Sequence, residues 1–229
     1  MPIRVVAFDA DDTLWHNEVY FQQAEEAFCA LMENYLPRHT VSRELLRTEL
    51  ENLPLYGYGI KAFTLSMVET ALRISDRHLP MSAIETIIGL GKAIVQKPVT
   101  VLDGVHDVLA ALQPHFRLVV ATKGDLLDQE RKLNASGLQH YFHHIEIMTE
   151  KQPKDFEKLL RHLDTPANEF VMIGNSLKSD VLPVLQLGGT GIQIPYHVTW
   201  AHEHAEAPLQ HPHFRSFDSV RHVVDYLLP

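Results

Sequence analysis

An apolar run near the start of the chain ends abruptly in a group of acidic residues. Residues 3–8 are typical of a buried β-strand, and Asp9, Asp11 and Asp12 follow directly. Holding several acids together without counter-charge is costly, but less so at the carboxyl end of a parallel strand, where open α/β sheets bind ligands. Asp9 and Asp11 could there gather a Mg2+ ion and divide the chemistry between a nucleophile and an acid/base. A polar strand end or a helix cap is the alternative.

Two further groups suited to phosphate chemistry follow other predicted strands. Thr122 ends the apolar run 118–121, and its hydroxyl, Lys123 and the following backbone N–H groups could hold a phosphate. Lys151 lies after the predicted strand 144–148, where a fixed ammonium would offset the repulsion of two carboxylates and pair with a phosphoryl oxygen. Lys154 competes for this role, and either lysine could equally be a solvated surface residue.

A last group of oxygen donors follows the predicted strand 169–173. Asn175 offers an uncharged oxygen ligand, and Asp180 adds a carboxylate at the start of the next helix, where an N-cap role is the alternative. Together with Asp9 and Asp11 these donors suit a hard cation that retains water, as Mg2+ does. The sequence therefore predicts Asp9, Asp11, Asn175 and Asp180 as metal ligands.

Alternating strand and helix patterns predict the elements that position these residues. Five strands are expected at 3–8, 117–121, 144–148, 169–173 and 190–194, and helices at 105–112, 125–136, 154–163, 179–187 and 217–228. Such alternation predicts an α/β fold with a Rossmann-like parallel sheet and helices on both of its faces.

Residues 16–97 interrupt this alternation with a predicted helical insertion. Helices are expected near 18–36, 41–53, 60–75 and 81–96, with Pro37, Pro54 and Pro80 between them. The expected domains are therefore a core, 1–15 with 98–229, and an inserted helical domain, 16–97. A glycine-punctuated stretch, 57–59, precedes Lys61, which could contact the substrate; an ordinary helix start is the alternative.

Composition limits the classes of function. The chain has 229 residues, of which 45% are apolar, and its net charge of −9 argues against a nucleic-acid partner. No apolar run reaches the length of a transmembrane helix, and the amino-terminal residues lack a signal-peptide pattern. A single cysteine, Cys29, suits a reducing compartment, so we expect a cytoplasmic protein with no membrane partner. The fifteen histidines lack the spacing of a zinc site.

In order along the chain, these motifs resemble those of the haloacid dehalogenase-like hydrolase superfamily. Asp9 to Thr13 matches its Asp-x-Asp-x-Thr motif, Thr122 its strand-end hydroxyl, and Lys151 its conserved lysine position. Residues 174–180 match its acidic last motif, and the 16–97 insertion lies where the family's helical C1 cap lies. Three features depart from the pattern: Asn175 replaces an acid, Asp12 stands where glycine is common, and the lysine motif has an unfamiliar form.

The resemblance implies a mechanism for the residues that match. Asp9 would form an aspartyl-phosphate, and Asp11 would protonate the leaving oxygen and then activate water. Thr122 and Lys151 would hold the phosphoryl oxygens, and Mg2+ would bind Asp9, the backbone carbonyl of Asp11 and Asn175, with Asp180 direct or through water. Dehalogenases of the superfamily lack an acid at the position of Asp11, because a halide leaves without a proton.

The function expected from the sequence is thus a Mg2+-dependent phosphatase for a small phosphorylated metabolite. A phosphomutase or phosphonate hydrolase of the same fold is an alternative. A receiver-like signalling domain would also gather acids, a threonine and a lysine, but it has no 80-residue insertion after its first strand. A non-catalytic phosphate-binding or scaffold protein is the third alternative.

Overall fold

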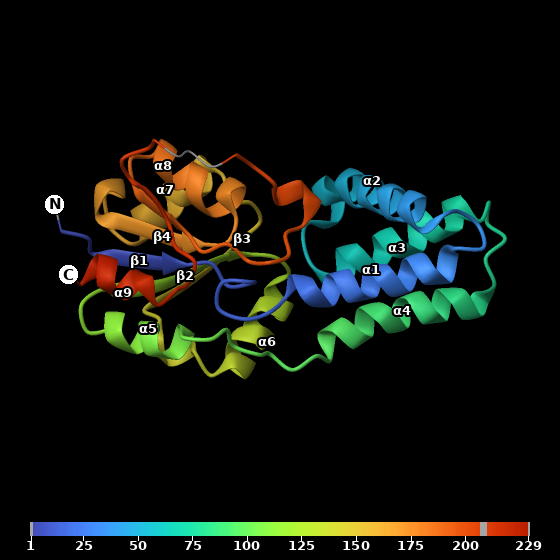
Figure 1. Ribbon diagram of the computed structural model, residues 1–229, viewed down its shortest axis with the longest axis horizontal. Helices are drawn as coiled ribbons and strands as arrows, with labels where there is room; N and C mark the ends of the chain where they lie inside the picture. Colours follow the sequence, from blue (N-terminus) through green and yellow to red (C-terminus); the bar gives the residue numbers. More distant parts are fainter. Residues whose placement is uncertain (1, 207–209, 229) are drawn as a thin grey trace. The chain divides into compact units, whose positions relative to one another are not determined.

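The computed structural model describes residues 2–206 and 210–228, and in that part of the chain six parallel strands form one sheet (Figure 1). The order is β3-β2-β1-β4-β5-β6. The strands are β1 (Val5–Phe8), β2 (Arg117–Lys123), β3 (His144–Met148), β4 (Phe170–Gly174), β5 (Thr190–Gln193) and β6 (Phe214–Ser216). The predicted α/β fold is confirmed. The sequence pattern misses β6, because three residues are too few to display a strand period.

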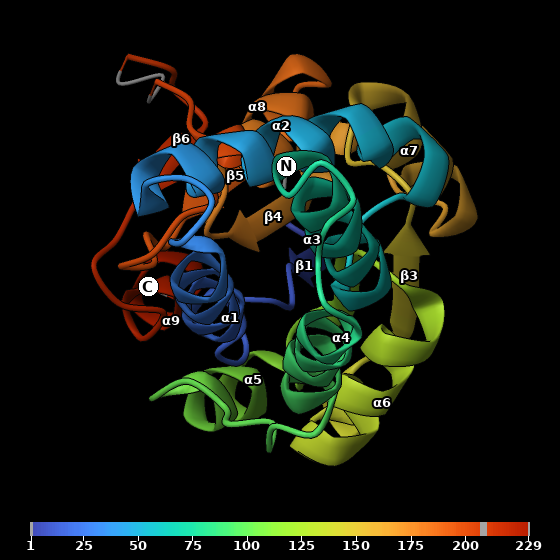
Figure 2. The same cartoon turned by 90° about the vertical axis from the view of Figure 1, so that its right-hand side faces the viewer.

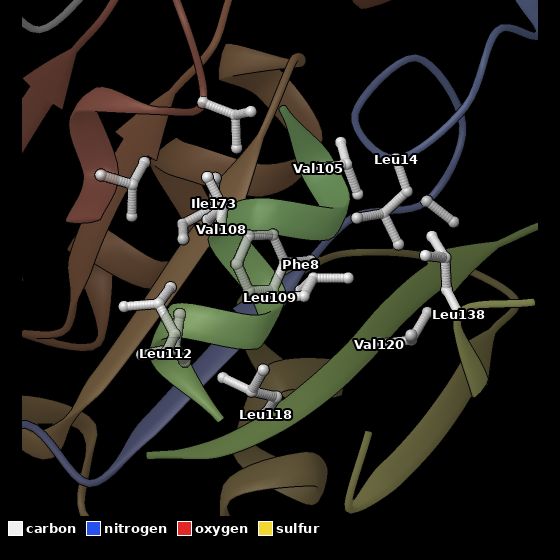
Figure 3. Packing of buried hydrophobic residues seen from close by; sticks show 14 of the residues in the cluster. Phe8, Leu14, Val105, Val108, Leu109, Leu112, Leu118, Val120, Leu138 and Ile173 are labelled. Carbon is white, nitrogen blue, oxygen red and sulfur yellow. The ribbon is translucent and has the colours of Figure 1, made fainter. Parts of the chain in front are cut away.

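Helices cover both faces of this sheet. One face carries α5 (Val105–Leu112), α6 (Leu126–Ser136) and α9 (His222–Leu227), and the other α7 (Pro153–His162) and α8 (Leu182–Gln186). Successive side chains of a strand point to opposite faces. Val6 and Phe8 of β1 therefore pack in the α5 cluster, whereas Val5 and Ala7 pack in the cluster of α7. Figure 3 shows the ring of Phe8 close to Val108 and Leu109 of α5.

The parallel arrangement gathers the functional segments at one edge of the sheet. The neighbouring strands β3, β2, β1 and β4 all run the same way, and Phe8 at the end of β1 pairs with Val120 of β2 and Ile173 of β4. Segments that follow these strands therefore emerge together, at the edge where open α/β sheets bind ligands.

By mutual contacts the chain divides into two units, the first containing the sheet and the second Val19–Pro98 with Gly124–Gln129. Apart from Glu18, the second unit holds α1 (Glu18–Met32), α2 (Arg38–Tyr56), α3 (Ile60–Ile74) and α4 (Met81–Val95). Figure 2 shows α1 nearly end-on and α2 along its length. Its core includes Phe28, Met32, Leu45, Met67 and Ile87, all fully or almost fully buried.

Two of the three prolines of this segment stand immediately before helices, but Pro54 does not separate helices as expected. Pro37 and Pro80 directly precede α2 and α4, whereas α2 continues through Pro54 to Tyr56. A proline in the last turn removes only one helical hydrogen bond, so the helix can continue for a few residues beyond it.

Among the described residues, none of the helices has the length and apolarity needed to cross a lipid bilayer.

A partly buried network of charges and hydroxyls connects the end of β2 with the segments that follow β4 and β5. Glu203, in the short helical turn η4 (Ala201–Glu203), lies with Oε1 2.5 Å from Lys123 Nζ. Its Oε2 accepts hydrogen bonds from Ser176 Oγ and Ser179 Oγ at 2.5 and 2.6 Å, and Lys123 also donates to Ser179 Oγ. Although burial raises it, Lys123 and the two hydroxyls lower the pKa of Glu203 to about 2.

This network predicts a specific loss of stability when Glu203 is neutralised. A carboxyl whose pKa is depressed on folding stabilises the folded protein above its unfolded pKa, and that contribution vanishes as the pH falls through the folded pKa. The pH-dependent part of the stability lost in Glu203→Gln should be about 3 kcal/mol above about pH 5 and should disappear towards about pH 2. Urea unfolding across this range measures it.

The matched control is Glu157→Gln, which neutralises an exposed glutamate of α7. It should change the free energy of unfolding by less than about 0.5 kcal/mol. A Glu203→Gln deficit that is small, or that stays constant from neutral to acidic pH, would contradict the ion pair as a stabilising element.

Candidate active site

Three buried, charged side chains form the centre of the candidate site. Lys151 Nζ lies 2.5 Å from Asp9 Oδ1 and 2.6 Å from Asp180 Oδ1. The side chains of Lys151 and Asp180 are each 1% exposed and that of Asp9 is 9% exposed. Lys154, the competing lysine, is exposed on α7. Of the two, therefore, Lys151 is the lysine placed between the carboxylates.

Local structure holds each member of this cluster. The amide of Asp9 donates to the carbonyl of Ile173 at 2.8 Å, which continues the pairing of β1 with β4 beyond Phe8. Lys151 precedes the start of α7, where Asp155 accepts the N–H of Gln152 at 3.1 Å. These backbone hydrogen bonds fix the points from which the nucleophile candidate and its lysine extend.

Asp180 lies in a π-helical turn, η3 (Leu177–Val181), that follows β4. Its Oδ2 accepts the N–H of Ser176 at 3.0 Å, so the carboxylate is folded back against the end of the strand. A Cβ atom built on Gly174 would lie 2.1 Å from that same oxygen. Glycine at 174 is therefore required for the close approach of Asp180 to the backbone.

The electrostatics of the cluster leave a deficit of positive charge. Burial raises the pKa of Asp9 to about 7; Lys151 lowers it, but the charges of Asp180 and Asp11 raise it further. Burial likewise raises the pKa of Asp180 despite Lys151. Burial alone would lower the pKa of Lys151, but Asp180 and Asp9 raise it, which keeps the ammonium charged. Two buried carboxylates thus share one ammonium, and a bound cation would favour their ionised forms.

Thr13 joins the segment after β1 to the segment after β4. Its Oγ1 lies 3.2 Å from Asp9 Oδ2 and 3.4 Å from Asn175 Oδ1, and it accepts the N–H of Asn175 at 3.1 Å. The sequence motif includes Thr13, but the pattern alone assigns it no contact. In the structure its hydroxyl places the amide oxygen of Asn175 beside the carboxylate of Asp9.

Asp12 occupies a backbone conformation that explains why glycine is common at this position. Its φ is 62°, in the left-handed region that aspartate tolerates better than most residues. Its carboxylate accepts the backbone N–H groups of Asn17 and Glu18 at 2.9 to 3.1 Å. Burial, with the charge of Asp11, raises the pKa of Asp12 to about 7, although these N–H donors lower it. Asp12 therefore supports the start of α1.

Asp11 has its own cationic partner, which the sequence does not reveal. Lys132 of α6 donates from Nζ to Asp11 Oδ1 at 2.6 Å and to Oδ2 at 2.8 Å. The indole of Trp15 donates to Oδ1 at 2.7 Å, and Lys132 also reaches Asn17 Oδ1 at 3.2 Å. Lys132 stands in a strongly charged part of α6, so periodicity cannot distinguish it from a surface lysine.

The remaining predicted residues lie in different surroundings. Thr122 is buried at the end of β2, with its Oγ1 3.3 Å from the carbonyl of Lys123, and Lys123 pairs with Glu203. Lys61 belongs to the helical unit, where its Nζ lies 2.9 Å from Asp125 Oδ2. The Lys61 side chain is 68% exposed, and a pair this exposed contributes about 0–1 kcal/mol to stability.

The oxygen donors of the candidate site suit a hard cation, although they do not form a cluster of acidic side chains. Asp9 and Asp180 supply carboxylate oxygens, Asn175 an amide oxygen and Asp11 a backbone carbonyl, all of the type that Mg2+ prefers. Throughout residues 2–206 and 210–228, no three His, Cys, Asp or Glu side chains converge as a metal site. A cation here would therefore depend on the amide, the carbonyl and water for part of its coordination.

Comparison with known proteins identifies relatives of this chain. A haloacid dehalogenase-like family hydrolase from Xanthomonas campestris is 43% identical, with a TM-score of 0.81, over 90% of this chain and 86% of its own. A putative hydrolase of the same class from Bacillus subtilis, solved with magnesium, shares the fold at 17% identity and a TM-score of 0.68, with both chains fully covered.

A relative from Methanopyrus kandleri is named glyceraldehyde 3-phosphate phosphatase. It is 27% identical over 201 aligned positions, and the alignment covers 84% of this chain and 84% of the relative. The family model of haloacid dehalogenase-like hydrolases matches residues 3–188, a span that contains Asp9, Thr122, Lys151 and Asp180. The chain therefore belongs to the haloacid dehalogenase-like hydrolases.

Proposed function

We propose that this hydrolase is a Mg2+-dependent phosphatase that acts on a small phosphorylated metabolite through an aspartyl-phosphate on Asp9. The observation that carries the proposal is the buried Asp9 carboxylate held by Lys151, with a second acid, Asp11, two residues further on. An acid at position 11 favours phosphate esters over haloacids, because an alkoxide leaving group needs a proton. The phosphatase named among the relatives supports the same reaction class.

In the first step Asp9 attacks the phosphorus atom. The new bond joins a carboxylate oxygen of Asp9 to phosphorus, and the bond from phosphorus to the ester oxygen breaks with its electron pair on that oxygen. Asp11 donates a proton to the leaving oxygen, which departs as an alcohol. Lys151, with Thr122 at the end of β2, balances the negative charge of the transferring phosphoryl group.

In the second step a water molecule attacks the aspartyl-phosphate. Asp11, now ionised, accepts a proton from the water, and the bond between phosphorus and the Asp9 oxygen breaks to release inorganic phosphate. Mg2+, held by Asp9, the backbone carbonyl of Asp11 and Asn175, with Asp180 direct or through water, would supply positive charge to the phosphoryl oxygens. Thr13 keeps Asp9 and Asn175 adjacent for that purpose.

The substrate class is a proposal from the relatives and from the insertion. The core motifs account for phosphoryl transfer, so recognition of the remainder of the substrate is assigned to residues 16–97 acting as a cap. The Methanopyrus kandleri relative makes triose phosphates the first compounds to test. Contact of Lys61 with substrate stays a prediction. A substrate anion would have to compete with Asp125 for the Lys61 ammonium.

The first test combines a substrate panel with Asp9→Asn. Wild-type protein should release inorganic phosphate from small phosphate esters only when Mg2+ is present, and Asp9→Asn should lower kcat by a factor on the order of 10^4, because the nucleophile is lost. Phosphate release across triose, sugar and aryl phosphates measures both. Circular dichroism confirms that the variant is folded. Near-normal turnover by folded Asp9→Asn would contradict the assignment of the nucleophile.

A second prediction concerns the amide that replaces an acid in the last motif. Asn175→Asp should keep or tighten Mg2+ binding, because a carboxylate binds a hard cation better, although it adds repulsion beside Asp9. Asn175→Ala should raise the Mg2+ concentration for half-maximal activity by about 10-fold or more, comparable to other losses at metal sites. Titration of activity and calorimetry with Mg2+ measure these changes. Identical Mg2+ dependence in all three proteins would place Asn175 outside the coordination sphere.

A further inference from the structure

We propose that Lys132 is a positioning residue that fixes the Asp11 carboxylate in the orientation needed for proton transfer. The inference rests on the proposed phosphatase reaction, in which Asp11 first gives up and then takes a proton. Lys132 lies far from Asp11 in the sequence, and it acts through Asp11 and not on the phosphoryl group itself.

The contacts of Lys132 define both the position and the plane of the carboxylate. Its Nζ lies within 2.8 Å of both Asp11 oxygens, so the ammonium faces the fork of the carboxylate. Trp15 Nε1 donates to Oδ1 from a second direction, at 2.7 Å. Two donors from different parts of the fold therefore restrain rotation about both side-chain torsions of Asp11.

The burial of Lys132 separates this pair from an ordinary surface salt bridge. The Lys132 side chain is 8% exposed and that of Asp11 is 24% exposed. Burying an ammonium and ordering a long side chain are both unfavourable unless strong partners compensate. Asn17 Oδ1, 3.2 Å from Nζ, adds another acceptor from the segment that leads into α1. The ammonium is thus directed by several acceptors towards one place, beside Asp11.

A fixed carboxylate matters because proton transfer depends first on geometry. A general acid or base must lie within hydrogen-bond reach of the atom it serves, and a displacement of about 1 Å can cost about 100-fold in rate. The other site lysine, Lys151, is committed to Asp9 and Asp180. The two acids of the first motif are therefore held by two different lysines, one for the nucleophile and one for the proton-transfer group.

The first part of the test compares Lys132→Met and Lys132→Arg with wild-type protein at saturating Mg2+. The kcat of Lys132→Met on an alkyl phosphate should fall by about 10–100-fold, and that on p-nitrophenyl phosphate, whose leaving group needs less protonation, by a smaller factor. KM should change by less than about 3-fold for both substrates, because phosphate contacts are retained. Lys132→Arg, which keeps a cationic donor, should recover part of the loss.

The control is Lys158→Met, which removes an exposed lysine of α7 and should leave both kcat values unchanged. Should Lys132→Met fail to fold, as judged by circular dichroism, Lys132→Gln takes its place in every comparison. Equal kcat for the folded variant and wild type on both substrates would overturn the inference, as would equal losses on the alkyl and aryl esters.

The second part of the test asks whether Lys132 acts through Asp11. In an Asp11→Asn background, Lys132→Met should lower kcat no further, because the carboxylate that Lys132 orients is already gone. Losses that multiply in the double variant would overturn the positioning role. The same assay separates the two levels of proposal: a wild-type protein as inactive as Asp9→Asn defeats the phosphatase reaction, whereas an active wild type with unaffected Lys132 variants defeats only the role of Lys132.

Discussion

The Lys151 ammonium between Asp9 and Asp180 is the interaction on which the site depends. Two carboxylates in a nearly dry environment repel each other, and removing the one cation between them would leave two uncompensated buried charges. Burial raises the pKa of both acids, and Lys151 opposes that rise. A cation bound beside the two carboxylates would favour their ionised forms.

The parallel sheet brings the oppositely charged members of this cluster together. Asp9, Asn175 and Lys151 follow three different strands, and only a shared direction of those strands brings the three segments to one edge. Backbone N–H groups also stabilise the buried carboxylates: the amide of Ser176 donates to Asp180, and the amides of Asn17 and Glu18 donate to Asp12. The same edge is tied together further by the pairing of Lys123 with Glu203.

Separate lysines divide the acids of the site into distinct environments. Asp9 and Asp180 share Lys151, Asp11 is held by Lys132, and Lys123 is committed to Glu203. The proposed reaction gives Asp9 and Asp11 different roles, and separate cationic partners let neighbouring carboxylates differ.

The sequence by itself determined the fold class and the places where chemistry could occur. Periodicity identifies five of the six strands found in the described part of the chain. The polar groups that follow these strands include Asp9, Lys151, Asn175 and Asp180, because a backbone period and a strand terminus are local properties. Only the tertiary structure decided which charges meet. In the structure Lys151, and not Lys154, lies beside Asp9, and Lys132 pairs with Asp11. The sequence does not reveal these pairs, because the partner of a lysine depends on which distant segments come within reach of its flexible side chain.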